Sequence, residues 1–96
     1  MKIITICGSL KYQDEMMRIA EEKSLEGFCV LTPVFPVIKG IEITDAQFAD
    51  LKEAHRKRIE LSDSILVVNP NKYIGESTKS EMEYAKKLGK EIIYQY

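Results

Sequence analysis

The stretch SILVVNPNKYIGESTKSEMEYAKKLGKEIIYQ, residues 64–95, decides the fold. Its first six residues, 64–69, are a mostly apolar run that Pro70 ends, and such a run predicts a buried β-strand. The apolar spacing after the next loop predicts a helix at about 78–88, and the run at 91–95 predicts a second strand. Because short connections join the two strands through a helix, we expect the strands to lie parallel with a right-handed crossover.

The same alternation of strand and helix precedes this stretch. Strands are predicted at 2–7 and 28–32, and helices are predicted at 11–26 and 44–61. Four strands joined by helices predict a small α/β fold, flavodoxin-like or Rossmann-like, with three layers and a four-stranded parallel sheet in the order 2-1-3-4. We expect residues 1–96 to form a single domain.

One segment, PVFPVIKGIEI at 33–43, fits neither type of element. Two prolines and a glycine interrupt it, yet it is too hydrophobic for a solvated loop. We expect it to be a flap or a subunit contact. A chain of 96 residues has a small core, which favours a homodimer or a larger homo-oligomer.

The composition narrows the class of protein. The chain is 45% hydrophobic and 30% charged with a net charge of −1, which argues against binding to a nucleic acid polymer or a membrane. No signal peptide precedes the first strand, and Cys7 and Cys29 lie in apolar runs, so we expect reduced thiols in a cytoplasmic protein. With one histidine and no dinucleotide-binding or P-loop motif, we expect neither a metal site nor a cofactor.

The strand order also predicts where a ligand would bind. In open parallel sheets, ligands bind outside the carboxyl ends of the strands, at the point where the strand order reverses. Here that point falls between the first and third strands. The segments expected to meet there are Gly8-Ser9, residues 69–71 and the loop that leads to Glu81. They predict a single cleft.

Glu81 has two interpretations. The sequence TKSE at 78–81 fits a capping box, in which Thr78 caps the helix and Glu81 bonds back to the Thr78 backbone N–H. Alternatively, Glu81 faces the cleft from the first turn of the helix. A carboxylate held there by N–H groups and hydroxyls can attack a sugar carbon, as in retaining glycosidases, and the helix dipole would help to keep it ionised.

Three stretches resemble the nucleoside 2-deoxyribosyltransferase-like superfamily, and most closely its short bacterial and phage branch. They are ITICGSL at 4–10, GFCVLTPVF at 27–35 and HRKRIELSDSILVVNPNKYIGESTKSEMEYAKKLGKEIIY at 55–94. The resemblance implies that Glu81 is the nucleophile toward C1′ of a 2-deoxynucleoside or its 5′-monophosphate. Members of the family place an acidic residue where this chain has His55. The resemblance therefore implies that His55 handles the proton of the leaving base, although a lone histidine on an apolar helix face also fits a core residue.

The remaining candidates lie at the edges of the predicted cleft. The candidate substrate-binding residues are Gly8, Ser9, Lys11, Tyr12, Asn69, Asn71, Gly75, Ser77 and Thr78. In the family, the turn after the first strand holds sugar or phosphate. Backbone N–H groups, hydroxyls and a lysine suit that role, whereas the amides and the aromatic ring suit a base. Several of these residues are equally suited to capping helices or shaping turns. The charged run KRIE at 57–60 is interpreted as a solvated helix face.

The sequence therefore predicts cleavage or transfer of the N-glycosidic bond of 2-deoxynucleosides or their 5′-monophosphates through a glutamate nucleophile. Two alternatives stay open. The first is a module that binds a nucleotide without cleaving it. The second is an assembly subunit in which the 33–43 segment makes the interface and the cleft is vestigial.

Overall fold

The computed structural model describes residues 1–96 and contains one parallel sheet of four strands. The strands are β1 (Ile3–Gly8), β2 (Cys29–Leu31), β3 (Ser64–Val68) and β4 (Glu91–Tyr94), and their order in the sheet is β2-β1-β3-β4. All three neighbouring pairs are parallel. The predicted α/β fold and strand order are confirmed.

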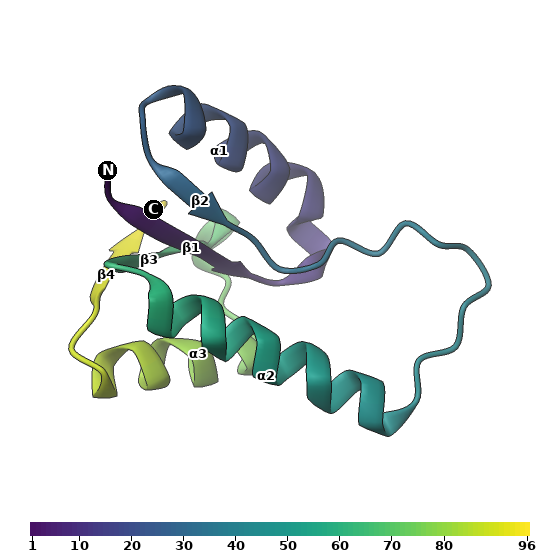
Figure 1. The fold of residues 1–96 in the computed structure, drawn as a ribbon. Coiled ribbons are helices and arrows are strands. Elements are labelled where there is room, and N and C mark those ends of the chain that lie inside the picture. Colours follow the sequence, from purple (N-terminus) through teal and green to yellow (C-terminus); the bar gives the residue numbers. More distant parts are fainter.

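Helices cover both faces of this sheet (Figure 1). Helix α1 (Gln13–Leu25) lies on one face, and α2 (Asp45–Leu61) and α3 (Glu76–Lys87) lie on the other. Two short 3₁₀ helices, η1 (Leu10–Tyr12) and η2 (Pro70–Lys72), follow β1 and β3. The result is the three-layer arrangement expected when parallel strands are joined by right-handed helical crossovers.

The strands are apolar on both faces because each face packs against helices. Ile4 and Ile6 of β1 pack with Met16 of α1 in one buried cluster. Cys7, which points to the opposite face, packs with Ile59 of α2 and other residues in a second cluster. Successive side chains of a strand alternate between faces, and this alternation places Cys7 on the same side as α2 and α3.

The start of α3 differs from the prediction. The helix begins at Glu76 with Gly75 as its N-cap, and the Lys79 N–H bonds to the Gly75 carbonyl oxygen at 3.0 Å. Thr78 is therefore already inside the first turn, where it is buried, and it does not cap the helix. The capping-box interpretation of TKSE is wrong. Glu81 lies in the second turn of the helix, one turn further along than expected.

The segment between β2 and α2 contains no helix or strand. It arches away from the sheet before α2 begins (Figure 1). Its apolar side chains are largely exposed, with Val37 at 79% and Ile38 at 68%. The Thr44 side chain and Gln47 then form a capping box at the start of α2. None of the helices combines the length and the apolar character that crossing a membrane requires.

Candidate functional site

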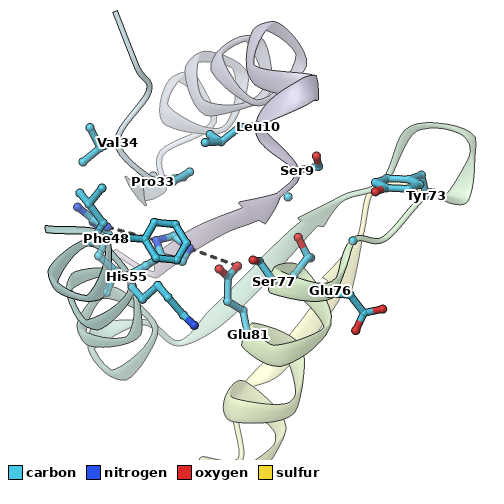
Figure 2. Close-up of a pocket in the computed structure, with 16 residues that line it drawn as sticks. Ser9, Leu10, Pro33, Val34, Phe48, His55, Tyr73, Glu76, Ser77 and Glu81 are labelled. Atoms are coloured by element: carbon cyan, nitrogen blue, oxygen red, sulfur yellow. Dashed lines mark hydrogen bonds and ion pairs between the residues drawn. The ribbon is translucent and has the colours of Figure 1, made fainter. Parts of the chain in front are cut away.

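A cavity of about 430 Å³ opens at the carboxyl ends of β1 and β3. It lies between α2 and the N-terminal half of α3, and the segment after β2 contributes two residues (Figure 2). The sixteen lining residues are Gly8, Ser9, Leu10, Pro33, Val34, Phe48, Leu51, Lys52, His55, Arg58, Tyr73, Gly75, Glu76, Ser77, Thr78 and Glu81. The position is the switch point between β1 and β3, as a doubly wound sheet leads one to expect.

Most of the residues that the sequence singles out meet at this cavity. Those that line it are Gly8, Ser9, His55, Gly75, Ser77, Thr78 and Glu81. Those that do not line it are Lys11, Tyr12, Asn69 and Asn71. The division follows the chain: the turn directly after β1, as far as Leu10, and the start of α3 reach the cavity, whereas the rest of η1 and the turn after β3 from 69 to 72 lie outside it.

The four outlying residues have structural partners or lie at other surfaces. The Lys11 ammonium lies 3.4 Å from the centre of the Tyr73 ring, and Tyr12 packs edge-on against the same ring at 6.1 Å. The Asn69 side chain bonds the backbone N–H and carbonyl oxygen of Tyr96. Asn71 adopts a left-handed backbone conformation with a φ of 56° in the turn after β3. These contacts tie the turns to each other and to the chain end.

Glu81 extends from α3 toward His55 of α2, and the two side chains point toward one another (Figure 2). The Glu81 Oε1 atom lies 3.7 Å from His55 Nε2, and 24% of the Glu81 side chain is exposed. Burial raises the pKa of Glu81 to about 7, although a hydrogen bond from the Cys7 thiol and the charge of Lys52 act in the opposite direction. Burial therefore acts against the ionised form that the helix dipole was expected to favour.

His55 is buried and neutral at pH 7. Burial and then the positive charge of Arg58 lower its pKa to about 4, and a hydrogen bond to the Ile6 backbone acts against them. The Arg58 Nη1 atom lies 3.3 Å from His55 Nδ1. A guanidinium can only donate, so Nδ1 accepts and the ring proton resides on Nε2, the nitrogen that faces Glu81.

The hydrogen bond from Arg58 also bears on metal binding. Ligand atoms of Cys7, His55 and Glu81 lie within 4.8 Å of one another, a grouping compatible with a metal ion. A metal would need the lone pair of His55 Nε2, and the proton would then move to Nδ1, directly against the Arg58 guanidinium. Burial, and then Glu81, also raise the pKa of the Cys7 thiol well above its usual value, which disfavours the thiolate that binds metals. This donor set does not suit a metal.

Sequence reasoning missed several lining residues. Arg58 belongs to the KRIE run, which was interpreted as a solvated face, yet it is only partly exposed and lines the cavity. The signal was available in the helical spacing, because Lys52, His55 and Arg58 recur every three residues and so lie along one face of α2. Leu10, Pro33 and Val34 gave no such signal, since their place depends on how separate segments meet.

The fold and the cavity define a small α/β protein with a ligand-sized hollow at the switch point of a parallel sheet. Among solved structures, the chain is similar to one described as "2-desoxiribosyltransferase from Leishmania mexicana", with a TM-score of 0.72 and 18% sequence identity. The match covers 98% of this chain and 63% of that chain. The protein therefore has a nucleoside 2-deoxyribosyltransferase-like fold. No family model matches the sequence, and no curated protein matches it.

Proposed function

We propose that the cavity binds a 2-deoxynucleoside or its 5′-monophosphate and that the protein cleaves or transfers its N-glycosidic bond. The observation that carries the proposal is the position of Glu81. Its carboxylate lies in a cavity at the ends of β1 and β3, the place where this class of fold binds ligands. The similarity to a protein described as a 2-desoxiribosyltransferase supports the same activity class.

The proposed chemistry uses the ionised form of Glu81. One carboxylate oxygen attacks C1′ of the sugar, the N-glycosidic bond breaks, and the base leaves with the electron pair and takes up a proton. A second base or a water molecule then attacks C1′, and the ester bond to Glu81 breaks. Either acceptor restores the carboxylate, so the same intermediate serves a transferase and a hydrolase.

His55 is better suited to holding Glu81 than to acid catalysis. A side chain whose pKa is about 4 carries no extra proton at pH 7. Because His55 Nδ1 accepts a hydrogen bond from Arg58, Nε2–H is the only donor of the His55 ring. We propose that this N–H orients the Glu81 carboxylate. The hydroxyls of Ser9, Ser77 and Thr78 are proposed to hold the sugar and any 5′-phosphate, because they line the same cavity.

The alternative is a module that binds the nucleotide without cleaving it. One observation favours it: the histidine at the position of the family's acid is neutral, so it has no proton ready for the leaving base. In that case Glu81 would be a ligand of the sugar hydroxyls rather than a nucleophile.

A panel of 2-deoxynucleosides and their monophosphates, assayed for base release and base exchange by chromatography, separates these functions. Glu81→Ala and Glu81→Gln should lower the rate by a factor on the order of 10³ or more, because the covalent step is lost. The matched control is Glu83→Gln, which removes an exposed carboxylate of the same helix and should keep the activity. A Glu81→Ala rate equal to that of the unmodified protein would end the enzymatic proposal. Binding in calorimetry without turnover would support the alternative.

We also propose that the protein forms a homo-oligomer through the segment at 33–43. Its aliphatic side chains are largely exposed, as is Phe48 of α2 at 56%, and they would be covered in an assembly. Light scattering on the unmodified protein and on a Val37→Asp/Ile38→Asp variant tests this, and the variant should dissociate. The control is Leu25→Asp, which changes an exposed apolar side chain on α1. An unmodified protein that is monomeric at micromolar concentration would contradict the proposal.

A further inference from the structure

Three elements bring one polar side chain each to the same buried point. Cys7 comes from β1, His55 from α2 and Glu81 from α3, and their ligand atoms lie within 4.8 Å of one another. Cys7 has no exposed surface and does not line the cavity. It is buried on β1 of the sheet, in the same core cluster as Ile59 of α2 and Ala85 of α3.

The hydrogen-bond donors and acceptors of this group can be assigned, starting from Arg58. Arg58 donates to His55 Nδ1, so the remaining ring proton is on Nε2. That atom lies 3.6 Å from Cys7 Sγ and 3.7 Å from Glu81 Oε1, and the ring also forms a hydrogen bond to the Ile6 backbone. The sulfur thus has the His55 N–H on one side, and the acceptor left in this group for its own S–H is the Glu81 carboxylate, whose ligand atom lies within 4.8 Å of it.

We infer that Cys7 is a positioning residue whose thiol donates a hydrogen bond to Glu81 and holds that carboxylate toward the cavity. Its consequence for turnover rests on the proposed function, but the contact itself does not. A thiol suits the place because sulfur is large enough to fill the packed layer between β1, α2 and α3 and still carries a donor.

The inference has a measurable consequence for the ionisation of Glu81. The charged and titratable groups around this carboxylate are Lys52, His55 and Arg58 from α2, Cys7 from β1, and Glu76 and Tyr73, which line the same cavity. Its neighbours Ser77 and Thr78 on α3 are neutral. Burial raises the Glu81 pKa, and the thiol opposes burial by bonding the charged form. Removing the donor should therefore raise that pKa further.

Carboxyl ¹³C NMR on glutamate-labelled protein, with the Glu81 signal assigned through Glu81→Gln, tests the inference. Cys7→Ala should raise the Glu81 titration midpoint by about one pH unit, the equivalent of one hydrogen bond to a charged group. Cys7→Ser, which keeps a donor, should titrate close to the unmodified protein. The control is Cys29→Ala, which removes the other thiol from β2 and should leave the midpoint unchanged.

The titration needs no turnover, so it fails or succeeds independently of the proposed function. Should Cys7→Ala not fold, Cys7→Val replaces the thiol with a somewhat larger side chain that has no donor and should give the same upward shift. A Glu81 midpoint in the folded Ala or Val variant equal to that of the unmodified protein overturns the inference. If the protein is an enzyme, the acid limb of kcat/KM should move upward with the NMR midpoint in Cys7→Ala and return in Cys7→Ser.

Discussion

The Nε2 atom of His55 lies 3.7 Å from the Oε1 atom of Glu81, yet the two side chains form no ion pair at neutral pH. The pKa of His55 is about 4, because burial and Arg58 both disfavour a second proton on the ring. The pKa of Glu81 is about 7, because burial disfavours its charge. In an ordinary histidine–glutamate pair the imidazole holds the extra proton. Here the carboxylate holds that proton below about pH 7, and the imidazole does not.

This arrangement predicts the pH dependence of the activity. Only the ionised carboxylate can attack C1′, so kcat/KM should rise with pH and level off above about pH 7, the pKa of Glu81 in the free protein. A profile of kcat/KM between pH 5 and 9 on the best substrate of the panel measures it. Activity that is already at its plateau at pH 5 would contradict the assignment of Glu81 as the nucleophile.

The same pKa predicts that Glu81 destabilises the fold at alkaline pH. The folded pKa, about 7, is raised above the unfolded value of 4.5, so the side chain's favourable contribution is present below pH 4.5 and is lost as pH rises through 7. Glu81→Gln should therefore raise the free energy of unfolding at pH 8 by up to about 3 kcal/mol relative to the unmodified protein, and this gain should vanish toward pH 4.5. Urea denaturation at several pH values measures the difference.

His55 acts on stability in the opposite direction and must be separated from Glu81. Its folded pKa of about 4 lies below the unfolded value of 6.5, so its contribution is present above pH 6.5 and is lost as pH falls toward 4. Both proteins in the comparison carry His55, so its effect cancels in the difference between them. Glu83→Gln controls for the loss of one negative charge on α3. An equal gain at pH 4.5 and pH 8 would contradict the prediction for Glu81.

Arg58 should set both the pKa and the tautomer of His55. Its guanidinium lies 3.3 Å from Nδ1 and lowers the His55 pKa in addition to burial. Arg58→Gln should therefore raise the pKa of His55, because the charge that opposes protonation is gone while the ring stays buried. The chain contains one histidine, so proton NMR of its ring follows the titration without assignment.

A matched substitution separates this effect from a general change of charge on α2. Lys57→Gln removes an exposed cation from the same helix, one position earlier, and leaves the contact with the His55 ring intact. It should leave the His55 titration close to that of the unmodified protein. Equal titrations for Arg58→Gln and Lys57→Gln would show that the guanidinium does not act on the ring.

The fold could be predicted from the sequence because its signals are local. The run at 64–69, the helical spacing after it and the glycine at 89 each fix one element, and the handedness of crossovers then leaves few arrangements of the sheet. The site could be predicted in part for the same reason. Parallel strands place the residues after β1 and before α3 at a common edge, so Ser9 and Glu81 were expected to meet.

What the sequence could not give depends on contacts between distant residues. Whether Glu81 is ionised depends on burial by other elements, and the helix register that determines its turn depends on Gly75 rather than Thr78 acting as the N-cap. The pairing of Arg58 with the ring of His55 needs a helix face whose inward direction is known. Asn69 is a candidate because it follows a strand, but its side-chain amide forms hydrogen bonds to the backbone of Tyr96.

Gly8, at the end of β1, is expected to be the least replaceable glycine at the cavity. A Cβ atom there would lie 3.0 Å from Met16 Sδ and 3.1 Å from the Val68 carbonyl oxygen, and the second of these is backbone that cannot move aside. Gly8→Ala should lower the free energy of unfolding by about 1–3 kcal/mol, the range for overpacking in a core. The comparison is Gly75→Ala, whose Cβ would meet the Tyr73 hydroxyl at an ordinary 3.4 Å and should be tolerated better. Urea denaturation measures the free energy of unfolding of both variants. A loss of stability in Gly8→Ala that is equal to or smaller than that in Gly75→Ala would show that β1 and β3 can separate enough to admit a methyl group.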